Sequence, residues 1–193
     1  MPTNLTTAPS EEPFTLTEAK SHLRVDITDD DSYITALIQA VREHAEPFLG
    51  RALITQTWDL FINNFPPSGS WLEIPFPPLQ SVTTIKYIDE NGTQQTLSSS
   101  IYTVDTNAEM GRVFLAYDQV WPTVRPILNA IEIRFVAGYG ANAEDIPESI
   151  RQGMKMLLGH LYENRETTKS GVPIVSVPQA YEWLLWPYRV VRF

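Results

Sequence analysis

The stretch SVTTIKYIDENGTQQTL, residues 81–97, decides the fold class of the chain. A run rich in β-branched residues meets Asn91-Gly92, and a polar run follows. Asn-Gly between two extended runs is typical of a hairpin closed by a two-residue type I′ turn. The stretch therefore predicts a β-hairpin with a type I′ turn near the middle of the chain.

More extended runs lie on both sides of this hairpin. Residues 54–62 alternate with a period of two, so every second side chain is expected on the same face. Short runs rich in apolar residues also occur over 71–76, 102–106, 111–117 and 130–140. The pattern predicts an antiparallel sheet or small barrel of six to seven strands over about 52–140.

Helical periodicity flanks this β module on both sides. Thr15 and Glu18 have capping-box spacing, and apolar residues spaced by three and four between residues 30 and 49 predict a helix that Gly50 ends. A long helix is expected over about 147–166. The sequence predicts an α+β fold in which helices from both chain ends pack together around an inserted antiparallel module. The expected domains are a flexible N-terminal arm (1–13), a helical core (14–51 and 141–169), the β module (52–140) and an aromatic C-terminal arm (170–193).

Composition excludes several function classes. The 193 residues contain no cysteine, so disulfides, thiolate catalysis and cysteine-ligated metals are ruled out. The net charge of −9 gives no cationic surface for retaining nucleic acid, although an acidic surface could let DNA slide past. No apolar run has the length needed to span a bilayer, and the N-terminus does not resemble a signal peptide. We expect a protein made and used in a cytoplasm.

The segment GHLYENRE, residues 159–166, is the best candidate for chemistry. His160 and Glu163 share a helix face, but a helical zinc site needs a second histidine one turn away, and none is present. AGYGAN, residues 137–142, lacks both the dinucleotide-binding glycine spacing and a phosphate-loop lysine. We therefore expect no catalytic, metal or cofactor site, and interpret the segment as the polar end of a core helix.

The C-terminus is unusually aromatic for a chain end. Acidic residues dominate residues 1–31 and basic residues dominate 169–193, which suits head-to-tail contact between subunits. Alternatively, the tail folds back on its own core, and both can hold for different residues. The predicted subunit or partner contacts are Tyr181, Trp183, Leu184, Trp186, Tyr188, Arg189 and Phe193, together with Arg165 and Glu166 as an intersubunit salt bridge.

Six pieces in order carry a resemblance to a known family. They are LTEAKSHLRVD, AVREHAEPFLGRALITQTWDL, IPFPPLQSVTTIKYIDENGTQQTL, VAGYG, IPESIRQGMKMLLGHLYENRE and LLWPYR. Together, over residues 14–189, they resemble the phage head–tail connector (adaptor) proteins of the gp6-like and gp8-like type, which also occur in gene transfer agents.

The resemblance implies a structural protein of the virion and no enzyme. Such proteins form a homo-oligomeric ring, usually of twelve copies, that joins the capsid portal to the next tail or stopper component and lines the DNA exit channel. It implies assembly in the cytoplasm of a bacterial host, with no membrane, cofactor or sequence-specific DNA binding. The helical portion matches the shared core of the family, and the β module resembles an elaboration seen in longer members.

Two other readings stay open from the residues. Exposed Trp58, Trp71 or Trp121 in a groove would indicate a carbohydrate- or ligand-binding β module. A deep pocket with two facing acids would indicate a hydrolase. For the connector reading, a chain without residues 178–193 is expected to fold but not to attach to portal-containing heads.

Overall fold

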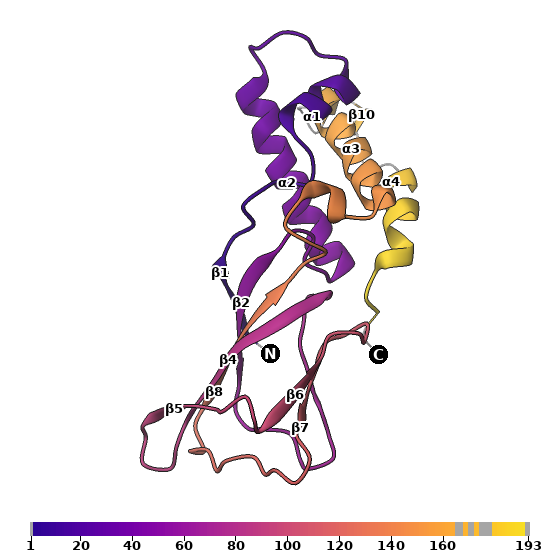
Figure 1. Cartoon of the computed structure of the whole chain (residues 1–193). Coiled ribbons are helices and arrows are strands. Elements are labelled where there is room, and N and C mark those ends of the chain that lie inside the picture. Colours follow the sequence, from indigo (N-terminus) through magenta and orange to yellow (C-terminus); the bar gives the residue numbers. More distant parts are fainter. Residues whose placement is uncertain (1, 165–167, 170–171, 174–178, 192–193) are drawn as a thin grey trace. The chain divides into compact units, whose positions relative to one another are not determined.

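A computed structural model describes residues 2–164, 168–169, 172–173 and 179–191. The chain divides into two compact units. We call Met1–Ser10 with Thr55–Tyr139 the β unit, and Glu11–Ile54 with Gly140–Phe193 the helical unit. Each unit combines segments that are distant in sequence (Figure 1). The combination of helices with antiparallel sheets confirms the predicted α+β fold.

Two antiparallel sheets build the β unit. The five-stranded sheet has the order β1-β2-β8-β4-β5, and the three-stranded sheet has the order β3-β7-β6. Seven of these strands come from the predicted module, in agreement with the upper expected number. The strands are β1 (Thr3–Thr7), β2 (Gln56–Ile62), β3 (Leu72–Glu73), β4 (Leu79–Ile88), β5 (Gln94–Thr96), β6 (Tyr102–Asp105), β7 (Arg112–Leu115) and β8 (Ile131–Ala137).

Strand β8 is the centre of the larger sheet and pairs with β2 on one side and β4 on the other. Its side chains alternate between buried and half-buried along the whole strand, as a period-two pattern requires. Ile131, Ile133 and Phe135 are fully buried. On the opposite face Arg134 faces Asp59 of β2 across the register, and its guanidinium binds that carboxylate at 2.8 and 2.9 Å.

The predicted hairpin is present, but its turn type differs from the prediction. Asp89 and Thr93 close a loop of three residues, because the Asp89 N–H donates to the Thr93 carbonyl at 2.9 Å. Gly92 alone has a positive φ, of 86°, whereas a type I′ turn needs positive φ at both central positions. The Asp89 carboxylate accepts N–H bonds from Asn91 and Thr93, which stabilises the longer loop.

The N-terminal segment also differs from the flexible arm expected over residues 1–13. Thr3–Thr7 form strand β1, which pairs antiparallel with β2 at the edge of the larger sheet. The Thr6 hydroxyl donates to Asp59 at 2.9 Å. The strand is mostly exposed and polar, so its order comes from backbone pairing rather than from a buried apolar face.

The helical unit begins with two capped helices. The Thr15–Glu18 capping box is confirmed, with both reciprocal bonds present. The second helix ends at Gly50 in the left-handed conformation, as predicted. The elements of the unit are α1 (Leu16–Leu23), α2 (Asp31–Leu49), η1 (Ala143–Asp145), α3 (Glu148–Glu163), β9 (Thr168–Lys169), β10 (Val172–Pro173), α4 (Gln179–Leu185) and η2 (Trp186–Tyr188).

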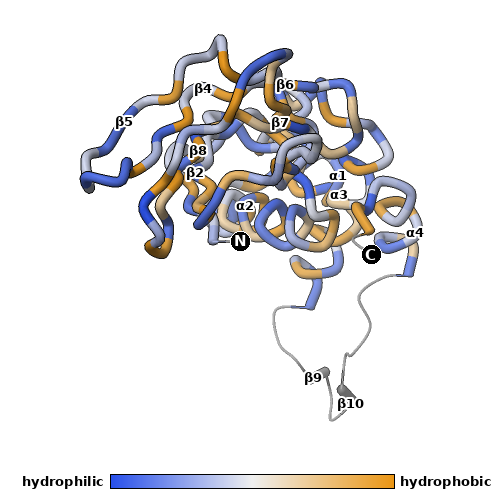
Figure 2. Tube along the Cα trace, turned by 90° about the horizontal axis from the view of Figure 1, so that it is seen from below, coloured by the Kyte–Doolittle hydropathy of each residue, from blue (hydrophilic) through white to orange (hydrophobic). Residues whose placement is uncertain are grey.

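Helix α3 packs against α1, α2 and α4, so helices from both chain ends share one core, as predicted (Figure 1). The helices carry both hydrophobic and hydrophilic positions (Figure 2), as amphipathic helices do. Gly153 of α3 allows α4 to approach closely, since a Cβ there would lie 2.4 Å from Leu185 Cδ1 and 3.4 Å from Leu184 Cβ.

The chain passes from the helical unit to the β unit after Ile54 and returns to the helical unit at Gly140. Ile54 and Gly140 form an isolated parallel bridge. Gly140 has room for no side chain, because a Cβ would lie 2.1 Å from the Asp145 carboxylate. Asp145 in turn accepts a bond from the Asn142 N–H at 2.9 Å. The two chain crossings at 54/55 and 139/140 are thus fixed side by side within this unit.

Candidate functional site on the helical unit

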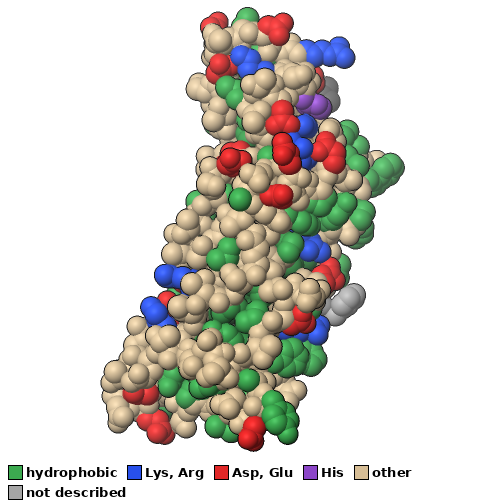
Figure 3. Space-filling model, in the orientation of Figure 1, with side chains coloured by type: hydrophobic (Ala, Val, Ile, Leu, Met, Phe, Trp, Pro, Cys, Tyr) green, Lys and Arg blue, Asp and Glu red, His purple; other side chains and the backbone are tan. Residues whose placement is uncertain are grey.

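The helical unit carries an exposed aromatic surface at its C-terminal end. Trp183 is 75% exposed and Trp186 is 59% exposed, which is unusual for the largest apolar side chain. Val191 is also exposed. We call Trp183, Trp186 and Val191 the aromatic surface. Figure 3 shows hydrophobic side chains gathered over the region of α4 at the right-hand edge of the molecule.

The opposite side of α4 anchors this surface. Tyr181 and Leu185, one helical turn apart, are both buried. The Tyr181 ring packs against His44 and Phe48 of α2, with centroid distances of 5.8 and 5.7 Å. Burial raises the pKa of the Tyr181 phenol to about 12. The short helix is therefore amphipathic, with its exposed tryptophans on the side that its own core leaves free.

Contacts with the end of α2 hold the segment that follows α4. The Val190 N–H donates to the Leu49 carbonyl at 2.8 Å, and the Arg51 guanidinium donates to the Tyr188 carbonyl. Arg189 lies over two rings, 5.2 Å from the centroid of Phe48 and 5.1 Å from that of Trp186. These contacts fix Trp186 with a cation beside it.

The structure divides the predicted contact residues into three groups. Trp183, Trp186 and Arg189 are exposed, Leu184 and Tyr188 are half-buried, and Tyr181 is in the core. Arg165, Glu166 and Phe193 lie outside the described residues. The i, i+4 spacing of Tyr181 and Leu185 was a signal that could have separated core from surface. Deleting residues 178–193 would remove core and surface together, so it does not test the surface alone.

A charge network ties the segment before α1 to the helices. Arg42 of α2, itself buried, binds Glu12 at 2.8 Å and Glu46 at 3.3 Å. Glu18 binds Arg151 of α3 at 2.6 Å and Lys155 at 3.5 Å. Burial acts to raise the pKa of Glu18, but the Thr15 N–H and the two cations outweigh it, so the pKa is lowered.

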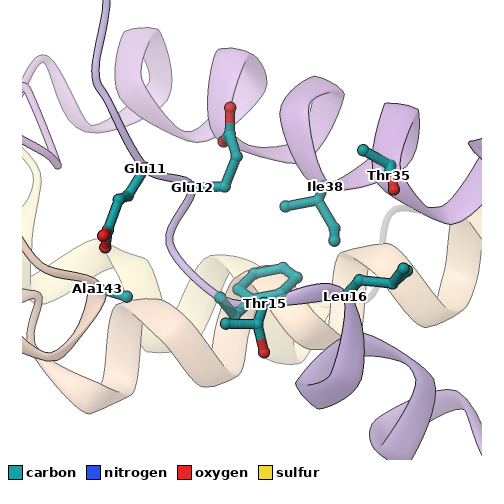
Figure 4. A pocket seen from close by; sticks show the side chains of 8 residues that line it. Glu11, Glu12, Thr15, Leu16, Thr35, Ile38 and Ala143 are labelled. Atoms are coloured by element: carbon teal, nitrogen blue, oxygen red, sulfur yellow. The ribbon is translucent and has the colours of Figure 1, made fainter.

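Beside this network lies a groove of about 290 Å³. Its apolar lining comes from Phe14 and Leu16 and from Ile38 of α2. Glu11 stands at the rim and points away from α2 toward the side of Ala143, whereas Glu12 points to α2 (Figure 4). The remaining lining residues are Glu12, Thr15, Thr35 and Ala143. A second, more polar hollow is lined by Thr17, Glu18, Ser21, His22, Gln152 and Lys155.

Three residues of GHLYENRE make structural contacts: His160, Tyr162 and Asn164. The Tyr162 hydroxyl donates to Asp30 at 2.6 Å, and Asn164 donates to the His160 carbonyl at 2.8 Å. Over the described ranges no group of three or more histidine and acidic side chains could hold a metal ion. In the same ranges no helix is both long and apolar enough to cross a membrane.

The tryptophans of the β unit do not form an exposed groove. Trp121 stacks face to face on Phe65, with centroids 4.6 Å apart and an interplanar angle of 2°. Trp58 packs on Phe76 at 4.5 Å. Trp71 alone of these three is exposed, beside the Arg112 guanidinium at 4.8 Å. Trp71 lines neither of the two hollows described above, so this arrangement does not favour the ligand-binding alternative.

Comparison with known proteins gives a family and a fold. The family model described as "Phage gp6-like head-tail connector protein" matches residues 13–119, which include α1, α2 and strands β2 to β7. The family model thus includes most of the β module, which the resemblance treated as an elaboration. Among curated proteins none matches the chain.

Three solved structures of gene transfer agent (GTA) particles share the fold at 23% sequence identity. The match covers 100% of this chain and 97% of each matched chain. They are the neck of an empty GTA particle computed with C6 symmetry (TM-score 0.81), the virion of a native GTA particle (0.80) and the neck of a native GTA particle computed with C12 symmetry (0.75).

Proposed function

The chain belongs to the phage gp6-like head–tail connector family, and on that premise we propose that it assembles as a ring at the head–tail junction of a virion. Its copies join the capsid portal to the next tail or stopper component, and DNA passes through the ring without sequence-specific binding. The chain acts by assembly and not by catalysis. It assembles in the cytoplasm of a bacterial host.

The aromatic surface carries this proposal. Tryptophan and arginine are the residue types that dominate binding energy at protein interfaces, and here they stand on a helix whose other side is fixed in a core. A surface that is ordered before binding loses little conformational entropy on association. Trp183 and Trp186 are therefore suited to contact a neighbouring copy or the portal.

The net charge and the matched particles support the ring. A chain with a charge of −9 is repelled by the phosphate backbone, which suits a channel that must release DNA. The matched chains occur in necks computed with sixfold and twelvefold symmetry, so a closed ring of six or twelve copies fits the same fold.

Surface substitutions test the proposal. We expect a chain with Trp183→Ser and Trp186→Ser to fold normally, because exposed side chains away from core features change stability by about 0.5 kcal/mol or less. Particles assembled with this chain should be heads without tails, counted by electron microscopy. Trp71→Ser, on the exposed tryptophan of the β unit, is the matched control and should leave tails attached. Normal tail attachment in the folded double variant would refute the role of the aromatic surface.

A further inference from the structure

The groove beside residues 11–16 has an apolar floor and a free acid. Phe14 and Ile38 form its floor, and both are buried parts of the fold. Glu12 is bound by Arg42, but Glu11 is exposed and has no ion-pair partner among the described residues. The groove therefore suits an apolar group with a positive charge beside it.

The same chain presents such a group elsewhere on the same unit. Trp186 projects beside the Arg189 guanidinium, and both side chains are exposed. The groove lies against the first half of α2, at Thr35 and Ile38, whereas Arg189 lies over Phe48 near the end of that helix. Ten residues of helix separate Ile38 from Phe48, or about 15 Å. A chain fixed in this way does not fill its own groove.

We propose that the groove binds the Trp186–Arg189 segment of a second copy of this chain, with Glu11 facing Arg189. The contact joins two different surfaces of the same unit, so it is heterologous and repeats around a closed ring. The inference rests on the proposed ring function and specifies the subunit interface within it. It also gives a role to the opposite charges of the two chain ends.

Cross-linking of the full chain tests the pairing directly. A photoreactive benzoyl-phenylalanine replaces Trp183, and unlabelled chain is mixed with isotope-labelled chain so that links between copies can be recognised by mass. We expect links between copies from position 183 to residues 11–16 or to the first half of α2. Links between copies at other segments, or no link at the highest soluble concentration, would overturn the proposal.

Two neighbouring substitutions on α2 provide a matched pair. Thr35 lines the groove, and the adjacent Ala36 is exposed but does not line it. Thr35→Phe should fill the groove and lower the yield of links between copies by about 30-fold, the loss expected of an interface hot spot. Ala36→Phe should leave the yield unchanged. Equal yields in the two variants would count against the groove as the binding site.

A charge exchange tests Glu11 and Arg189. Glu11→Lys and Arg189→Glu should each lower the yield of links about 5-fold, and the double variant should recover it, because an exposed ion pair contributes up to about 1 kcal/mol. Counting attached tails on particles built with each variant distinguishes failure of this inference from failure of the proposed function. If loss of Trp183 and Trp186 prevents attachment and the groove variants do not, the groove fails and the connector role stands.

Discussion

The two units differ in where most of their tryptophans lie. In the β unit Trp121 stacks on Phe65 and Trp58 packs on Phe76, so these rings complete the packing of strands and loops. In the helical unit Trp183 and Trp186 project from a helix whose Tyr181 and Leu185 are buried. A short amphipathic helix can hold part of an aromatic cluster in the core and present the rest to a partner.

The most exposed apolar residues of the β unit lie instead in a loop. Tyr117, Val120 and Leu128 are largely exposed within residues 117–128, which contain no helix or strand. Side chains on a loop have fewer partners to hold them than side chains on a packed helix, so ordering them for binding costs more. The difference favours the helical unit as the binding surface that we propose.

The largest expected loss of stability comes from truncating a buried aromatic side chain in the core of each unit. Tyr181→Ala and Phe135→Ala should each lower the free energy of unfolding by about 3–5 kcal/mol, because both side chains are buried. Hydrogen exchange should show the loss in the helical unit for Tyr181→Ala and in the β unit for Phe135→Ala. A loss spread evenly over both units in each variant would contradict the division of the chain.

The next effect concerns the close contact between α3 and α4. Gly153→Val should destabilise the helical unit by about 1–3 kcal/mol, since the added side chain overlaps Leu185, which is fully buried. Urea unfolding measures the loss, and tryptophan fluorescence reports the change around Trp183 and Trp186. The control is Ala36→Val at an exposed position of α2. Gly69→Val is unsuitable as a control, because Gly69 has a positive φ that strains any other residue. A stability change no larger than that of the control would show that α4 can move away freely.

Acid should destabilise both units through different carboxylates. Bonds from Arg134 lower the pKa of Asp59 in the β unit, and the pKa of Glu18 in the helical unit is lowered as described above. Because these pKa values are lower in the folded chain, the unfolded chain takes up protons first as pH falls. The stability contribution is complete above the ordinary carboxylate pKa, about 4, and is lost as pH falls through the folded values.

Replacing each carboxylate by the corresponding amide shows how much of the acid sensitivity of each unit that carboxylate causes. Asp59→Asn should reduce the pH dependence of unfolding in the β unit, and Glu18→Gln should reduce it in the helical unit. Urea titrations over an acidic pH series, followed by hydrogen exchange, measure both. An unchanged pH dependence in either variant would mean that its carboxylate does not contribute.

The smallest effect concerns the buried phenol. At neutral pH Tyr181→Phe should change the free energy of unfolding by about 1 kcal/mol or less. Because the folded pKa is raised from 10.0 to about 12, the wild-type chain should lose stability as pH rises through this interval. The Phe variant should lose less over that interval. Absorbance titration of the tyrosines checks the raised pKa of Tyr181. The control is Tyr102→Phe in the β unit, because burial also raises the pKa of Tyr102. Titration of Tyr181 at its ordinary pKa would contradict its burial.

The sequence predicted those elements whose signal is local. The apolar run over residues 130–140 predicted the strand that the structure shows at Ile131–Ala137, and Thr15 with Glu18 predicted a capping box. Strand β1 was missed because a polar edge strand has no apolar period, and its partner residues in β2 are fifty or more positions away in the sequence. The turn at Gly92 was assigned the wrong type because the Asp89 carboxylate, outside the Asn-Gly pair, favours a longer loop.

The sequence predicted which segment carries most of the candidate contact residues, but not which of their side chains are exposed. That exposure depends on the packing of α4 against His44 and Phe48. The groove could not be predicted, because Phe14 and Ile38, which line it, are distant in sequence, and so are Glu12 and Arg42, whose ion pair lies beside it. Long-range ion pairs of this kind leave no periodic pattern in a sequence.

The bridge between Ile54 and Gly140 holds the two ends of the β module together, so the module can be replaced as one piece. Its two ends leave the helical unit at neighbouring points, so a short glycine linker from 54 to 140 could take its place without stretching the helical scaffold. A chain of residues 11–54, linker and 140–193 would then keep α1 to α4.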